Sequence, residues 1–178
     1  LTGYGSNKKV NREMLKEAMN PTHITASLVG EPTMYGAVRL SAFFEEAFKR
    51  GFKTAFLVTN GTYPDVLSKL TTEPSQLYLS VCAPDEVTYK HVSRPLMKDA
   101  WERLLESIEL LKSFTCPTVM RITLARNLNL KDESGYARLI KRGESTYIEP
   151  KAAMNVGYGF QTGRMKYENM PRHSEILE

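Results

Sequence analysis

Cysteine is scarce in this sequence: the 178 residues contain only Cys82 and Cys116, which stand far apart and form no pair motif. Two isolated thiols exclude a disulfide-stapled scaffold and indicate a reduced, intracellular protein. The three histidines, His23, His91 and His173, are scattered as well. Together these residues do not make the all-cysteine or mixed cysteine and histidine set of a closed structural zinc site, so we expect no metal site built from this chain alone.

Long apolar runs and a secretory leader are also missing. No run approaches the ~20 apolar residues that a membrane helix needs. The opening residues, LTGYGSN, have neither the basic nor the apolar region of a signal peptide. We therefore expect a cytoplasmic protein with no membrane partner. Because the chain begins at Leu1 rather than Met, we also expect a fragment or a processed piece.

The overall composition is that of one globular domain. Hydrophobic residues make up 42% and charged residues 25% of the chain, a balance that supports a packed core. The net charge of +4 permits a polyanionic partner such as RNA. Many metabolic enzymes are equally basic, so the charge alone leaves the partner open.

Short apolar runs alternate with amphipathic stretches along most of the chain. Strands are expected at 23–29, 54–58, 76–81, 118–124 and 147–149. Helices are expected between them, at 40–48, 64–70, 97–111 and 136–143, and a leading helix is capped by Asn11. This order predicts an α/β fold with a parallel sheet and right-handed crossovers. The leading helix has no strand before it, as expected if a first strand were missing. Residues 151–164 are expected to form a long loop, and residues 165–178 a truncated helix.

In parallel sheets of this kind, ligands bind at the carboxyl ends of the strands. Each expected strand is followed by polar residues, among them GEPT at 30–33 and TNGT at 59–62. Such residues also serve as ordinary turn formers, which is the simpler explanation for 59–61. Arg121 is different, because a charge inside a central strand is costly unless it is paired. Either it forms an internal ion pair, with Glu31 or Glu149, or it binds an anion.

Several segments, in order, carry a resemblance to a known family. The stretches at 27–33, 57–62 and 76–81 resemble strands two to four of the radical S-adenosylmethionine (SAM) barrel. The wider sequence is similar to the enzymes that make 4-demethylwyosine in tRNA. The segments that carry this similarity are 17–23, 94–96, 101–103, 121–124, 147–152 and 155–158. The resemblance covers nearly the whole chain.

The resemblance implies a partial (β/α)6 barrel that holds strands two to six, with SAM bound over a 4Fe–4S cluster. It implies chemistry on N1-methylguanosine in phenylalanine tRNA, with pyruvate as carbon donor and an electron donor such as a flavodoxin. The cofactor performs the difficult chemistry, and the protein positions and shields it. The family's CxxxCxxC cluster motif and its pyruvate-binding lysine are absent from this sequence and are expected upstream of Leu1.

The resemblance also assigns roles to residues of this chain. The ammonium of SAM is expected at Gly30, Glu31 and Pro32, where glycine permits a close backbone approach. Neutral hydrogen bonds are expected from Thr59, Asn60 and Ser80. The Arg121 fork suits a carboxylate, either that of SAM or that of pyruvate. Glu149 and Lys151 are expected to face the substrate.

Residues 151–178 are the expected RNA contact. Lys151, Arg164, Lys166 and Arg172 supply positive charge near the last strand. Tyr158 and Phe160 offer flat faces on which a base could stack. The alternative is a glycine-rich connection whose aromatic side chains pack back on the barrel.

Some residues depart from the family pattern: Gly36 follows Tyr35 in place of proline, and Ala83 and Asn155 replace the expected Asp and His. The last change argues against proton transfer by the C-terminal loop. A cluster-free SAM- or RNA-binding module derived from such a barrel is the alternative function. A third possible function is that of a radical SAM enzyme for another substrate, such as a glycyl-radical activase. The segments 94–96 and 155–158 argue against it.

The cysteine count generates a prediction. Cubane clusters are held by about three or four thiolates, so purified protein of this sequence should contain no stoichiometric iron and sulfide after anaerobic reconstitution. Iron and sulfide analysis measures this. A cluster ligated by Cys82 and Cys116 would contradict it.

Overall fold

A five-stranded parallel sheet, with its strands in sequence order, forms the centre of the molecule. The computed structural model describes residues 2–27 and 30–177. The strands are β1 (His23–Ala26), β2 (Thr54–Thr59), β3 (Gln76–Ser80), β4 (Thr118–Leu124) and β5 (Tyr147–Ala152). Because all strands run in one direction, their carboxyl ends meet at one edge of the sheet.

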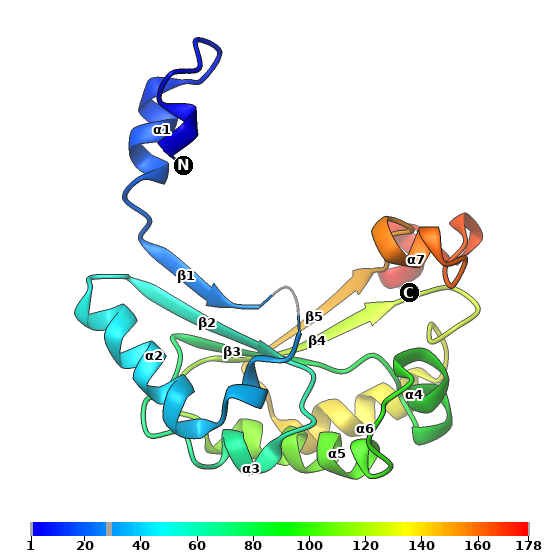
Figure 1. The fold of residues 1–178 in the computed structure, drawn as a ribbon. Helices are drawn as coiled ribbons and strands as arrows, with labels where there is room; N and C mark the ends of the chain where they lie inside the picture. Colours follow the sequence, from blue (N-terminus) through cyan, green and yellow to red (C-terminus); the bar gives the residue numbers. More distant parts are fainter. Residues whose placement is uncertain (1, 28–29, 178) are drawn as a thin grey trace.

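Helices cover one face of this sheet and leave the other face open (Figure 1). The covering helices are α2 (Ala37–Lys49), α3 (Pro64–Leu67), α4 (Glu86–Ser93), α5 (Ala100–Leu110) and α6 (Glu133–Gly143). On the open side, α1 (Arg12–Ala18) projects at one end, and α7 (Gly157–Gln161) and α8 (His173–Leu177) lie at the other. Short 3-10 turns complete the chain: η1 (Thr2–Tyr4), η2 (Pro32–Tyr35), η3 (Leu111–Ser113) and η4 (Tyr167–Asn169).

The core lies between the sheet and its helices. Leu57 of β2 and Leu77 and Leu79 of β3 are fully buried, while the residues between them on the strands are partly exposed. Phe44 of α2 and Leu104 of α5 pack into the same core. Each such side chain stabilises the fold by about 1.5–3 kcal/mol through removal of apolar surface from water.

The sequence predicted the sheet and most of the connecting helices. The expected strand at 118–124 coincides with β4, and Asn11 caps α1 by accepting hydrogen bonds from the amides of Glu13 (2.9 Å) and Met14 (3.1 Å). The last strand extends to Ala152, beyond the expected 149. Residues 28–29 of the first expected strand lie outside the described residues.

The structure differs from the expected elements in three places. Helix α4 was not predicted because Tyr89 is its one large buried apolar side chain, which leaves no periodic stripe to find. The expected loop at 151–164 contains the end of β5 and the short α7. The expected helix at 165–178 is instead η4 and α8, which are separated by Pro171, a residue that cannot donate to a continuous helix.

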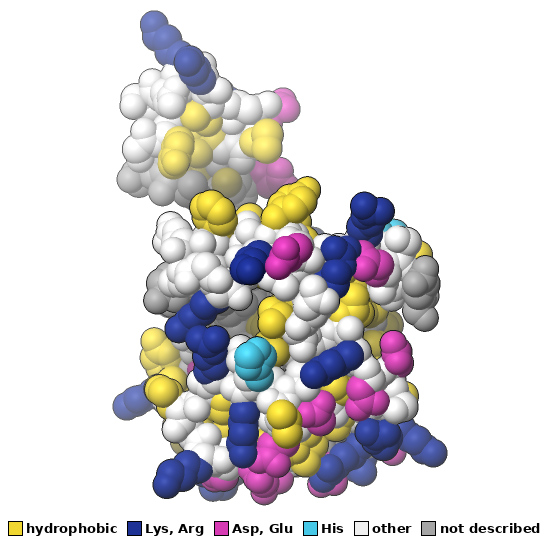
Figure 2. Space-filling view, turned by 90° about the vertical axis from the view of Figure 1, so that its right-hand side faces the viewer, with side chains coloured by type: hydrophobic (Ala, Val, Ile, Leu, Met, Phe, Trp, Pro, Cys, Tyr) yellow, Lys and Arg dark blue, Asp and Glu magenta, His cyan; other side chains and the backbone are white. Residues whose placement is uncertain are grey.

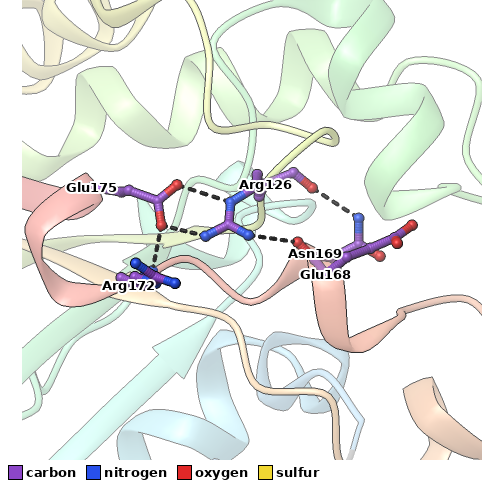
Figure 3. Close-up of polar contacts among 5 residues, drawn as sticks. All are labelled: Arg126, Glu168, Asn169, Arg172 and Glu175. Carbon is purple, nitrogen blue, oxygen red and sulfur yellow. Dashed lines mark hydrogen bonds and ion pairs between the residues drawn. The ribbon is translucent and has the colours of Figure 1, made fainter.

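Arg126 attaches the C-terminal segment (residues 153–177) to the end of β4 (Figure 3). Its guanidinium donates to both carboxylate oxygens of Glu175, with an Nε–Oε1 distance of 2.8 Å, and to the carbonyl of Glu168 at 3.1 Å. Its backbone exchanges hydrogen bonds with Asn169: the Arg126 amide donates to the Asn169 carbonyl, and the Asn169 side-chain amide donates to the Arg126 carbonyl. One arginine therefore fixes η4 and α8 beside the carboxyl edge of the sheet.

Gly61 generates a stability prediction. Its φ of +76° suits glycine, and an added Cβ would lie 2.7 Å from Leu79 Cδ1 and 3.0 Å from Leu104 Cδ1. Gly61→Ala should lower the free energy of unfolding by about 1–3 kcal/mol through backbone strain and overpacking. Urea denaturation measures the loss. The control is Gly51→Ala, which has a similar φ of +87° but no heavy atom within 4 Å of the added Cβ. Equal losses in the two variants would show that the clash contributes nothing.

Glu175 generates a pH prediction. Hydrogen bonds from the Arg126 guanidinium and from the Arg172 amide lower the pKa of Glu175 from 4.5 to about 2. A lowered folded-state pKa stabilises the fold above pH 4.5, and this stabilisation is lost as pH falls toward 2. Glu175→Gln should therefore be less stable than the parent at pH 7, and the difference should shrink between pH 4.5 and 2. Urea unfolding across this range measures it. Glu45→Gln, an exposed α2 variant, is the control and should show no such change.

Candidate functional site at the carboxyl edge of the sheet

A row of polar side chains crosses three neighbouring strands on the open face. In the sheet register, Ser80 of β3 is paired with Arg121 of β4, and Arg121 with Glu149 of β5. The preceding row, Leu79 and Met120, is fully buried against the helices. Because side chains alternate between the two faces of a strand, Ser80, Arg121 and Glu149 all lie on the face without helices.

Arg121 is held by two contacts on this face. Its Nε lies 2.5 Å from Oε2 of Glu149, and its guanidinium carbon lies 4.4 Å from the centroid of the Tyr78 ring. Of the two carboxylates considered from the sequence, the partner is Glu149 and not Glu31. The contact with Glu149 uses Nε, and the structure shows no hydrogen bond from the terminal Nη atoms within 2–27 and 30–177. These two nitrogens remain able to bind a planar anion in bidentate fashion.

The carboxylate of Glu31 joins two loops at the same edge. Its Oε1 accepts hydrogen bonds from the Thr33 amide (3.1 Å), the Thr33 hydroxyl (2.7 Å) and the Thr59 hydroxyl (2.6 Å). Its Oε2 accepts from the Asn60 amide at 2.7 Å. The side-chain oxygen of Asn60 in turn accepts from the amide and hydroxyl of Thr62. Glu31, Thr59 and Asn60 are thus brought together, as a fixed support between η2 and the end of β2.

A groove of about 810 Å³ runs beside this support, along the outer edge of β1. Gly30, Glu31 and Pro32 line it, together with Thr25 and Ser27 of the preceding segment. Its remaining wall is mostly apolar, from Ile24, Ala26, Leu40 and Phe43. Gly30 has a φ of +81°, a conformation that glycine adopts without strain. The groove combines apolar walls with a few polar groups, as small-molecule sites do.

The two cysteines lie at opposite edges of the sheet. Cys82 lies two residues after the end of β3, and burial raises the pKa of its thiol, with a smaller opposing effect from the charge of Lys151. Cys116 precedes β4, where burial and the nearby Glu73 carboxylate raise its thiol pKa to about 12. No group of three His, Cys, Asp or Glu side chains that could hold a metal ion occurs among the described residues. These residues do not fit an iron–sulfur cluster.

The expected RNA-binding residues lie on β5 and the C-terminal segment. Lys151 is exposed at the end of β5, and Arg164 and Lys166 are exposed between α7 and η4. Lys166 lies 3.7 Å from the carboxylate of Glu168. Phe160 is 65% exposed, so this ring does not pack back on the sheet. The side chain of Tyr158 lies outside the described part of the structure.

Sequence reasoning missed Asn129, which fixes the carboxyl ends of β3 and β4. Its buried amide donates to the carbonyls of Cys82 (2.7 Å) and Thr123 (2.8 Å), and its oxygen accepts from the Ala125 amide at 2.6 Å. It also missed Tyr78, whose ring lies under Arg121. Strand alternation could have placed Tyr78 beside Arg121, whereas no local pattern marks Asn129.

No helix in the described ranges is long and apolar enough to cross a membrane. The sequence comparisons show a family resemblance along the whole chain. Residues 142–178 match the family model described as wyosine base formation. The S-adenosyl-L-methionine-dependent tRNA 4-demethylwyosine synthase of Pyrococcus horikoshii is 42% identical over 181 aligned residues, which cover 100% of this chain and 52% of that protein. The chain therefore spans about half the length of the curated relative.

The structure comparisons agree with the sequence comparisons. A solved structure of TYW1 with a lysine–pyruvate adduct bound matches 99% of this chain and 54% of its own length, with a TM-score of 0.82 and 37% identity. A radical SAM methyltransferase from Sphaerobacter thermophilus matches 93% of this chain and 49% of its own, with a TM-score of 0.59 and 14% identity, which shows likeness of fold. Over its whole length, in sequence and in structure, this chain is similar to about half of the S-adenosyl-L-methionine-dependent tRNA 4-demethylwyosine synthases.

Proposed function

We propose that the parent protein of this chain forms 4-demethylwyosine from N1-methylguanosine in phenylalanine tRNA, with pyruvate as the carbon donor. The observation that carries this proposal is the 42% identity to a named synthase over the full length of the chain. The lysine–pyruvate adduct in the TYW1 structure supports pyruvate as the second substrate. We place this activity in the cytoplasm.

The sheet would form strands two to six of a (β/α)6 barrel. The cysteine ligands of a 4Fe–4S cluster would come from outside these 178 residues, because Cys82 and Cys116 are at opposite edges of the sheet. When bound, the cluster would supply one electron to SAM, and a flavodoxin-like protein would supply that electron to the cluster. The role of this chain would be to bind SAM, orient both substrates and exclude water.

SAM would bind at the carboxyl edge, between the groove and the polar row. Its ammonium would contact the backbone of Gly30, Glu31 and Pro32 and the negative charge of the Glu31 carboxylate. That carboxylate already accepts four hydrogen bonds, so its main contribution would be to hold this backbone in place. Thr59, Asn60 and Ser80 would form the polar surround of the ribose and the methionine end.

Arg121 would bind a carboxylate, that of SAM or that of pyruvate. Its terminal Nη atoms point to no partner among the described residues, while Glu149 and Tyr78 fix the orientation of the group. Glu149 and Lys151 would then face the substrate from the last strand. The positive charge of Lys151 also lowers the pKa of the Cys82 thiol, which partly offsets the effect of burial.

Residues 151–178 would contact the RNA. Lys151, Arg164 and Lys166 would bind phosphates, and Tyr158 and Phe160 would stack on an unpaired or flipped base. The attachment of this segment through Arg126 supports the proposal, because it holds the exposed cations beside the edge where chemistry would occur.

The alternative is a SAM- or RNA-binding module that has no cluster. The residues encoded upstream of Leu1 decide between the two, because a CxxxCxxC motif there is needed for the enzyme. The test is expression of the full reading frame, anaerobic cluster reconstitution, and an assay on methylguanosine-containing tRNA with pyruvate. Cluster formation without modified tRNA would contradict the proposed substrate.

Two substitutions test the SAM site in the reconstituted full-length protein. Glu31→Ala should weaken SAM binding, because the loops that it joins lose their support. Arg121→Lys should raise the Kd of SAM or the KM of pyruvate about tenfold, since an ammonium cannot reproduce two parallel hydrogen bonds worth about 1.5–3 kcal/mol. Arg138→Lys, on the exposed surface of α6, is the control. Unchanged binding of both ligands in Arg121→Lys would eliminate the carboxylate role.

A double substitution tests the RNA contact. Neutralising Arg164 and Lys166 should lower tRNA affinity and flatten the plot of log affinity against log salt by up to about two units, because fewer counterions are released. Fluorescence titrations of labelled tRNA at several salt concentrations measure both quantities. If both stay unchanged while SAM cleavage is intact, the C-terminal segment does not bind the RNA.

A further inference from the structure

The connection between α4 and α5 carries a second concentration of positive charge, distinct from the C-terminal segment. Lys90, on the last turn of α4, and Arg94 and Lys98, in the connection, are all exposed. We propose that these three residues, the basic turn, bind phosphates of the same tRNA, outside the anticodon base that is modified. This inference rests on the proposed function and extends it to a part of the surface that the family resemblance does not assign.

The first argument is the absence of compensating charge. Several arginines of the described part of the chain are ion-paired with its carboxylates, among them Arg50, Arg103, Arg121, Arg126, Arg138 and Arg142. By contrast, the side chains of Arg94 and Lys98 form no ion pair or hydrogen bond with any residue in the described ranges. Lys90 forms an ion pair with Glu86, and the charge of Glu102 also acts on it. Unpaired exposed cations are the groups that release counterions when they meet a phosphate backbone.

The second argument is shape. Lys90, Arg94 and Lys98 surround an open hollow of about 480 Å³, with Pro95 and Met97 in its wall. Leu96 also lines the hollow, and its side chain is fully exposed. A hollow with cations on its rim and apolar atoms in its wall suits a phosphate together with its ribose.

The third argument is rigidity. The Tyr89 ring lies 5.5 Å from the Trp101 ring, which holds the end of α4 against α5. An ion pair between Asp99 and Arg103 fixes the start of α5. Arg94 itself ends α4 in the left-handed conformation, with a φ of 47°. Glycine or asparagine adopts this conformation more easily, so a long cationic residue is kept here at a conformational cost.

The fourth argument is position. Helix α4 and the C-terminal segment lie at the same end of the molecule, the end at which the strands finish (Figure 1). The loop after β4 lies near both: Arg126 binds the C-terminal segment, and the charge of Lys131 contributes to lowering the pKa of Asp85, the residue that caps α4. Figure 2 shows Lys and Arg side chains across this whole end face, with carboxylates between them. One RNA hairpin could contact both cationic regions.

A simpler explanation is that cations at the end of α4 only neutralise the negative end of the helix dipole. This accounts for Lys90 and Arg94 but not for Lys98, which lies outside the helix. The explanation also makes an opposite prediction: if these residues serve stability, their removal should destabilise the fold and leave RNA binding unchanged.

The test uses Arg94→Gly combined with Lys98→Ala in the full-length protein. Glycine relieves the left-handed strain at position 94, so the melting temperature should stay the same or rise. Affinity for phenylalanine tRNA should fall on the order of tenfold at low salt, and the plot of log affinity against log salt should flatten by about two units. Because the variant is at least as stable as the parent, weaker binding cannot result from unfolding.

The matched control is Lys49→Ala with Lys53→Ala, which removes the same charge from the opposite edge of the sheet. An equal loss of affinity in both variants would show that the loss comes from the change in net charge and not from the position of the cations, and would overturn the inference. Unchanged tRNA binding by the basic-turn variant, with weaker binding by the Arg164 and Lys166 variant, would overturn the inference and leave the proposed function intact. If the unsubstituted protein binds no tRNA, both this inference and the proposed function are wrong. Inorganic phosphate that binds the hollow without competing with tRNA would assign a small-anion site and also overturn the inference.

Discussion

The parallel direction of the five strands is the constraint on which the rest of the structure depends. It brings every carboxyl end to one edge, and the shared register then aligns Ser80, Arg121 and Glu149 in a single row. With helices packed on one face, the other face can expose polar side chains without disturbing the core. A charged residue such as Arg121 is tolerated in a central strand for this reason: it points away from the buried layer and meets a carboxylate and an aromatic ring.

The α/β class and the parallel five-stranded sheet could be predicted from the sequence, because burial imposes period-two and period-3.6 patterns on strands and helices. Helix α4 could not, since it buries too few apolar side chains to show a stripe. The polar residues at the carboxyl edge were identified by their position after each strand, and their role in binding stays a prediction. Their partners were not identified, because contacts such as Glu31 with Thr59 or Arg126 with Glu175 join residues 28 and 49 positions apart, and no local pattern encodes them.

The hydrogen bonds at the carboxyl edge divide into two kinds. The first kind holds loops at fixed positions, through hydrogen bonds from neighbouring backbone and hydroxyl groups to Glu31, Asn60 and Asn129 or from the Asn129 amide to backbone carbonyls. Arg121 and Lys151 keep donors that face the open side. A site of this design keeps its shape before a ligand arrives, so less of the binding free energy is lost to ordering. The exposed cations of the C-terminal segment and of the α4–α5 connection lie on backbone that is also held in place, by Arg126 in the first case and by the contact between Tyr89 and Trp101 in the second.

Within residues 2–27 and 30–177 the sheet does not close on itself: β1 and β5 each have a neighbouring strand on one side only. The outer edge of β1 therefore presents unpaired backbone groups directly beside the 810 Å³ groove, whose lining residues Met34 and Tyr35 are exposed. An extended peptide can form backbone hydrogen bonds with such an edge and add a strand to the sheet. In isolation, these 178 residues would associate with one another through this strand edge. A strand added at β1 would suppress this self-association and would also cover the groove beside the proposed SAM site.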